Sequence, residues 1–74
     1  ELEGHTDSSG SAATNRRVSL ERANSIRNTL IMNHGVNPNQ VKAFGVGSSK
    51  PIDTNDTSEG RANNRRVSAT LKIQ

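Results

Sequence analysis

The sequence predicts an α+β fold, a two-layer α/β sandwich whose helices pack on one face of a sheet. Three observations support this expectation. Apolar residues repeat at helical spacing over residues 12–33, polar and apolar residues alternate over 67–73, and a short β-rich run occupies 41–46. With a strand end at 2–5 and a helical turn near 58–64, the predicted order is strand, helix, strand, short helix, strand.

The chain is predicted to begin within a strand. Residues 2–5, with the sequence LEGH, lack the polar lead-in that usually precedes the first strand of a domain. The following residues, 6–11, are turn formers, and Gly10 is the strongest breaker among them. We therefore expect a loop to leave the end of this strand and to lead directly into a helix.

The long helix is predicted to run from about Ala12 or Asn15 to Asn33. Gly35 follows as the expected left-handed residue, and Pro38 prevents continuation of the helix. The residues expected on its core-facing side recur at three- and four-residue steps and are Val18, Ala23, Ile26 and Leu30.

The second half of the chain is predicted to hold two strands and one short helix. After the strand at 41–46 comes a loop, and Thr57 or Ser58 is expected to cap a helical turn that reaches about Asn64. In the last strand the apolar positions alternate with polar ones, so only one of its faces is expected to be covered. Those apolar positions are Val67, Ala69, Leu71 and Ile73.

Composition narrows the classes of protein. Hydrophobic residues make up 28% of the chain, with one Phe, one Met and no Trp, Tyr or Cys. Without cysteine there is neither a disulfide framework nor a cysteine-based zinc site. The longest uninterrupted apolar stretch, residues 30–32, is far shorter than the roughly 20 residues that span a membrane. So lean an apolar content predicts that part of an ordinary domain is missing from this chain.

An enzyme is not expected, and neither is a metal or a cofactor. The candidate bases and ligands are His5, His34 and seven carboxylates, but no second histidine stands at metal-ligand spacing. No nucleophile-elbow motif is present. His34 is expected to be a surface residue at the C-terminal dipole of the helix, and His5 a strand residue whose imidazole bonds a neighbouring loop.

Nucleic-acid binding is also disfavoured. The chain carries ten basic and seven acidic residues, a formal net charge of +3, and two Arg-Arg pairs. Modules that bind single strands usually add aromatic residues for base stacking, but Phe44 is the only aromatic residue in the sequence. Arg16, Arg17 and Arg27 are therefore interpreted as a solvated helix face.

A charged pair of positions is the strongest indication of a ligand. Asn15, Val18 and Arg22 fall at i, i+3 and i+7, on one side of the long helix, and Asp7 lies in the loop before it. Asp7 and Arg22 could form a plain ion pair. Alternatively they could bracket a zwitterion, with Asp7 binding an ammonium and Arg22 gripping a carboxylate through its planar guanidinium.

Three motifs resemble the OmpA-like peptidoglycan-binding family. The first is the GHTD loop at residues 4–7. The second is the helix signature N-x2-L-S-x2-R-A-x2-V-x3-L, which matches from Asn15 to Leu30 with Val18 in place of Leu and Ile26 in place of Val. The third is the ending N-x-T-x2-G-R-x2-N-R-R-V, which matches residues 55–67.

The resemblance implies a binding site for meso-diaminopimelate of the peptidoglycan stem peptide. In the family, the carboxylate matching Asp7 and the guanidinium matching Arg22 hold this residue. The positions matching Asn15 and Arg65 contact or border it. The implied ligand-binding residues are Asp7, Ser9, Asn15, Val18, Arg22 and Arg65.

The resemblance further implies that residues 1–74 form a non-enzymatic module. This module is a single domain that lacks its N-terminal strand and helix. It would anchor a periplasmic, outer-membrane-associated envelope protein to the cell wall, with membrane attachment only through upstream parts of the parent. The alternative is a structural or protein-interaction module that keeps the fold without binding peptidoglycan. The sequence does not specify an oligomeric state.

Overall fold

A computed structural model describes residues 1–70 and confirms the predicted fold class. It contains three strands, β1 (Leu2–His5), β2 (Ala43–Gly47) and β3 (Val67–Ala69). The helices are α1 (Ala12–His34), the single 3-10 turn η1 (Pro38–Gln40) and α2 (Ser58–Asn64). Within residues 1–70 no helix is both long enough and apolar enough to cross a membrane.

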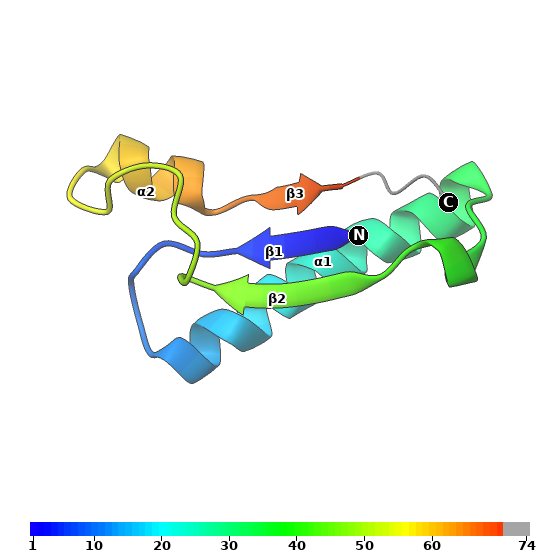
Figure 1. Ribbon diagram of the computed structural model, residues 1–74, viewed down its shortest axis with the longest axis horizontal. Helices are drawn as coiled ribbons and strands as arrows, with labels where there is room; N and C mark the ends of the chain where they lie inside the picture. Colours follow the sequence, from blue (N-terminus) through cyan, green and yellow to red (C-terminus); the bar gives the residue numbers. More distant parts are fainter. Residues whose placement is uncertain (71–74) are drawn as a thin grey trace.

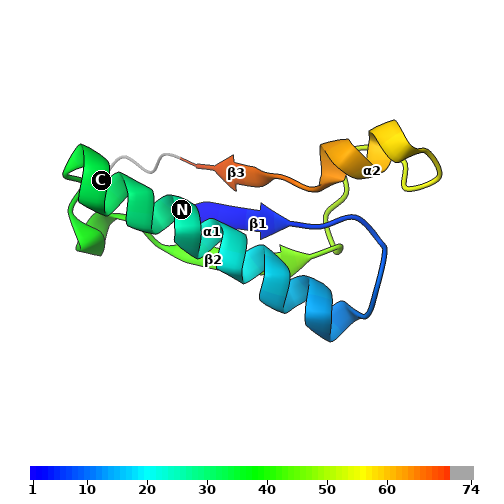
Figure 2. The same ribbon diagram turned by 180° about the vertical axis from the view of Figure 1, so that it is seen from behind.

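The three strands form a mixed sheet in the order β2-β1-β3. β1 pairs in parallel with β2 and antiparallel with β3, so that Gly4 lies between Gly45 and Val67. Helix α1 covers one face of this sheet, whereas α2 lies beyond the end of the sheet at which β1 ends (Figures 1 and 2). The loop at residues 6–11 leaves the sheet at that same end (Figure 1).

The ends of α1 are set by a serine cap, which was not predicted, and by the predicted C-terminal glycine. The side chain of Ser11 accepts a hydrogen bond from the amide of Thr14 at 3.1 Å and caps the N-terminus. Gly35 adopts the left-handed conformation with φ 67°, and its N–H bonds the carbonyl oxygen of Leu30. The helix therefore begins at Ala12, the earlier of the two predicted starts, and its predicted C-terminal glycine is confirmed.

Small residues let α1 lie directly on the sheet. A Cβ added to Gly4 would stand 1.8 Å from the carbonyl oxygen of Ser19, and one added to Gly45 would stand 2.5 Å from the amide nitrogen of Leu20. Ser19 and Ala23, on the facing side of the helix, are fully buried. The two strands can thus approach the helix backbone only because they carry glycine at these positions.

The predicted core stripe of α1 is wrong for Ile26, which is 41% exposed. The buried positions are instead Asn15, Ser19 and Ala23, at steps of four residues. The close backbone approach selects small side chains for the contact, so a branched residue such as Ile26 lies on the flank of the helix. Leu30, the last residue of the predicted stripe, is half-buried.

The segment that enters β2 departs from the prediction as well. The 3-10 turn Pro38–Gln40 precedes the strand, which begins at Ala43 instead of position 41. Arg27 was expected to be solvated, but its guanidinium donates to the carbonyls of Val41 at 2.8 Å and Pro38 at 2.9 Å. This side chain satisfies carbonyls that no helix or strand partner reaches, and it ties the turn to α1.

The short helix and the last strand follow the predicted order. Thr57 is the N-cap of α2, and its hydroxyl accepts a hydrogen bond from the amide of Gly60 at 3.0 Å. β3 covers Val67–Ala69, and Thr70 adds two backbone hydrogen bonds to Glu1, each of 2.8 Å. The predicted inward positions Leu71 and Ile73 lie outside the described residues.

The glycine contact predicts a large steric effect. Gly4→Ala should lower the free energy of unfolding by at least about 3 kcal/mol, because the new methyl group overlaps a helix carbonyl that cannot move alone. Gly35→Ala is the matched control: nothing lies within 4 Å of its added Cβ, so only the left-handed backbone conformation opposes it, at about 1–2 kcal/mol. Urea denaturation followed by circular dichroism measures both. Equal losses in the two variants would contradict the proposed close packing.

Candidate ligand-binding site

Asp7 lies at the end of the sheet from which the loop after β1 emerges. Its side chain is 10% exposed, and both carboxylate oxygens are bonded. Oδ1 accepts the backbone N–H of Ser9 at 2.8 Å, and Oδ2 accepts Nη1 of Arg65 at 2.5 Å. The Ser9 amide, followed by Arg65, lowers the pKa of Asp7 to about 2. A buried carboxylate is thus held ionised at neutral pH.

The first turn of α1 lies against this loop. Asn15 is buried, and its side-chain amide lies 3.5 Å from the carbonyl oxygen of Asp7. Val18 is half-buried and one turn further along the helix. Ser9 is exposed, and its backbone amide donates to the carboxylate. The predicted residues Asp7, Ser9, Asn15 and Arg65 are therefore brought together.

Arg22 stands apart from that group. It is exposed, and it makes no hydrogen bond or ion pair with any residue in the range 1–70. Seven residues beyond Asn15, it lies about 10 Å further along the helix axis. The plain ion pair between Asp7 and Arg22, one of the two arrangements considered from the sequence, is not formed. Asp7 has Arg65 as its counter-ion instead.

Sequence reasoning missed a buried asparagine that organises the loop behind the site. Asn64 is fully buried; its Oδ1 accepts from the amides of Ile52 at 2.8 Å and Asp53 at 3.0 Å. Its Nδ2 donates to Oδ1 of Asn55, which also accepts the amide of Ser8 at 3.3 Å. Asn55 thus bridges Asn64 to the Asp7 loop. The indication in the sequence was the place of Asn64 in the third motif, directly before Arg65.

His5 occupies a different environment from the one predicted. The residue is 1% exposed, and within the described part of the chain neither ring nitrogen has a hydrogen-bond partner in place of the expected loop contact. Its Nε2 lies 3.4 Å from a carboxylate oxygen of Glu3. Burial, and then the charge of Arg66, lowers the pKa of His5. Residues 1–70 contain no group of three His, Cys, Asp or Glu side chains that could hold a metal ion.

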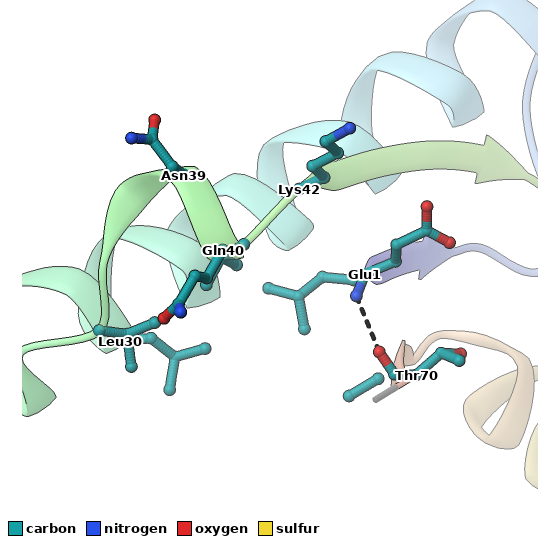
Figure 3. Close-up of a pocket in the computed structure, with 10 residues that line it drawn as sticks. Glu1, Leu30, Asn39, Gln40, Lys42 and Thr70 are labelled. Carbon is teal, nitrogen blue, oxygen red and sulfur yellow. Dashed lines mark hydrogen bonds between the residues drawn. The ribbon is translucent and has the colours of Figure 1, made fainter. Parts of the chain in front are cut away.

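A cavity of about 770 Å³ lies at the opposite end of the sheet. Figure 3 shows it between the start of β1, the end of α1 and the turn before β2. Its charged lining residues are Glu1 and Lys42, and its apolar ones include Leu2, Leu30 and Val41. None of the predicted ligand-binding residues lines this cavity.

The fold is that of a small two-layer α/β module that carries a charged group of side chains around Asp7. Residues 1–65 match the OmpA family, and the chain belongs to that family. It is 47% identical over 73 residues to outer membrane porin F of Pseudomonas aeruginosa, covering 99% of this chain and 21% of the porin. It is 44% identical over 70 residues to outer membrane protein Omp38 of Acinetobacter baumannii, covering 95% of this chain and 20% of Omp38.

Solved structures agree with the fold. The peptidoglycan-associated lipoprotein from Burkholderia pseudomallei superposes with a TM-score of 0.84 at 30% identity, over 89% of this chain and 55% of the lipoprotein. The periplasmic domain of Helicobacter pylori MotB gives a TM-score of 0.76 at 36% identity, over 89% of this chain and 43% of that domain. These relatives are envelope proteins rather than enzymes, and they confirm the predicted localisation in the cell envelope.

Acid should weaken the folded state through Asp7. Its pKa is about 2 in the folded chain against an ordinary value of 3.8, so its stabilising contribution is complete above pH 3.8 and is lost as the pH falls through about 2. Asp7→Asn removes this titration. The difference in unfolding free energy between wild type and Asp7→Asn should therefore shrink over that pH range, as measured by urea denaturation at each pH. A difference that stays constant across the range would show that folding does not lower the pKa of Asp7.

The buried asparagine predicts a second, independent effect. Asn64→Ala should cost roughly 2–4 kcal/mol of unfolding free energy, because it leaves two amides of the loop without their acceptor. Asn63→Ala is the control, since this exposed neighbour makes one side-chain bond, to Oδ2 of Asp53 at 2.8 Å; it should cost less than about 1 kcal/mol. Thermal unfolding of both variants measures the difference. Similar losses of unfolding free energy in both variants would show that Asn64 does not organise the loop.

Proposed function

We propose that the chain binds peptidoglycan non-covalently, through the diaminopimelate residue of the stem peptide. One observation carries the proposal: the buried, ionised carboxylate of Asp7 lies beside the first turn of α1, and further along the same helix stands an exposed guanidinium, Arg22, that has no partner among residues 1–70. Membership in the OmpA family supports it, because one structural relative is a peptidoglycan-associated lipoprotein.

The free end of diaminopimelate matches these two charges. It carries an ammonium and a carboxylate on one carbon atom. Asp7 accepts the ammonium, and Arg22 binds the carboxylate with its planar pair of donors. Asn15, Ser9 and Val18 contribute polar and van der Waals contacts around them, and Arg65 borders the same space. No covalent bond changes, so the role is binding and not catalysis.

In the parent protein this module anchors an envelope component to the cell wall. The chain spans about a fifth of the length of the two outer-membrane relatives named above, 21% and 20%. The remaining part of such a parent provides the membrane attachment. A periplasmic module that holds the wall by non-covalent bonds needs only modest affinity per site, because many stem peptides lie along one glycan strand.

Co-sedimentation with purified sacculi tests the proposal. Folded wild-type chain should sediment with diaminopimelate-type sacculi, and Asp7→Asn or Arg22→Ala should reduce the affinity at least about tenfold, the loss expected for one charged hydrogen bond. Arg17→Ala is the matched control: it removes an exposed arginine of the same helix that bonds no other residue in 1–70. It should bind like wild type.

Two outcomes would contradict different parts of the proposal. If folded wild type remains in the supernatant, the chain is a structural or interaction module and does not bind peptidoglycan. If it sediments but neither Asp7→Asn nor Arg22→Ala differs from Arg17→Ala, the binding site lies elsewhere. Sacculi of the lysine type provide a ligand control, since they lack the second carboxylate and should bind more weakly.

A further inference from the structure

Access to Asp7 is blocked from one direction by Arg65. The Asp7 side chain is 10% exposed, whereas that of Arg65 is 43% exposed and lies against Oδ2. The other oxygen is bonded to the amide of Ser9, only two residues away in the same loop. Oδ2, which is covered by the partly exposed Arg65 guanidinium, is therefore the oxygen at which an incoming ammonium can replace an existing partner.

The two bonds to Asp7 differ in how easily they break. The Ser9 amide is fixed by the loop backbone, so it cannot leave without rearranging that loop. Arg65 donates through Nη1 alone, and no other atom of its guanidinium bonds a described residue. Its backbone N–H is held at the end of α2 by the carbonyls of Arg61 and Ala62, each at 3.2 Å. The side chain can thus move while its backbone stays in place.

We infer that Arg65 is an exchangeable counter-ion that occupies the ammonium site of Asp7 until a ligand arrives. This inference rests on the proposed function and deepens it. On binding, the ligand ammonium replaces the guanidinium at Oδ2, and Arg65 turns to the carboxylate of the same ligand end. No covalent bond forms or breaks: Asp7 exchanges one cation for another, and Arg65 and Arg22 share the ligand carboxylate.

The exchange makes the site selective for a zwitterion. Asp7 supplies one negative charge, while Arg65 and Arg22 supply two positive charges. A ligand with both an ammonium and a carboxylate adds one charge of each sign, so the displaced guanidinium gains a new partner. A plain amine would add a third positive charge and leave Arg65 without a partner. The intramolecular pair therefore excludes amines that lack the neighbouring carboxylate.

Two small probes separate these cases. meso-Diaminopimelate has an ammonium and a carboxylate at each end, and cadaverine has the same spacing of ammonium groups without the carboxylates. Calorimetry or NMR titration of wild type, Arg65→Gln and Arg17→Gln with each probe gives the ratio of the two affinities. Arg65→Gln removes the guanidinium that competes with the ligand amine for Asp7. The same change removes a partner of the ligand carboxylate. Its preference for diaminopimelate should fall at least about tenfold, while Arg17→Gln should keep the wild-type ratio.

The wild-type chain offers a direct readout that needs no variant. Saturation with diaminopimelate should shift the Nε–H resonance of Arg65 as its guanidinium leaves Asp7, and this measurement stands even if Arg65→Gln does not fold. An unshifted Arg65 resonance, or an unchanged affinity ratio in folded Arg65→Gln, would overturn the exchange while leaving peptidoglycan binding intact. Absence of diaminopimelate binding together with failure to sediment with sacculi would overturn both the proposed function and the exchange.

Discussion

The close contact between α1 and the first two strands is the constraint on which the rest of the structure depends. Gly4 and Gly45 leave room for the helix backbone, and Ser19 fills the contact on the helix side. The Ser19 hydroxyl accepts the amide of Gly47 at 2.9 Å and donates to the carbonyl of Arg16 at 2.9 Å. Helix and sheet are therefore fixed by backbone approach and hydrogen bonds, with Leu2 and Ala23 as the buried apolar residues among those described.

This contact also determines where the site forms. With α1 pressed onto the sheet, its N-terminal turn meets the loop that leaves β1, and Asn15 reaches the carbonyl of Asp7. The third contributor, Arg65, ends α2, which is positioned by Asn64 and the loop before it. Two adjacent segments and a third, 58 residues beyond Asp7, thus supply one charged surface. The site is precise because each segment is held by its backbone, and only the arginine side chains are left free to respond.

Local features were predictable from the sequence, whereas long-range pairings were not. Ser, Gly and Thr at element ends act on neighbouring amides, so the helix limits and the left-handed Gly35 followed from adjacent residues. The family motif placed Asp7 and Arg65 in one site, but their ion pair joins residues 58 positions apart. The buried role of Asn64, the fixed position of Arg27 and the exposure of Ile26 also depend on tertiary packing, which a helical periodicity does not encode.

The polar character of the helix–sheet contact has a thermal consequence. The heat capacity change of unfolding grows with the apolar surface that becomes exposed and is reduced by polar surface. Over residues 1–70, the buried set includes His5, Thr6, Asn15 and Ser19 and few large apolar side chains. The stability of this region therefore varies only gently with temperature, with a broad maximum. A domain built this way stays folded over a wide range of temperatures and depends little on the hydrophobic effect that weakens on cooling.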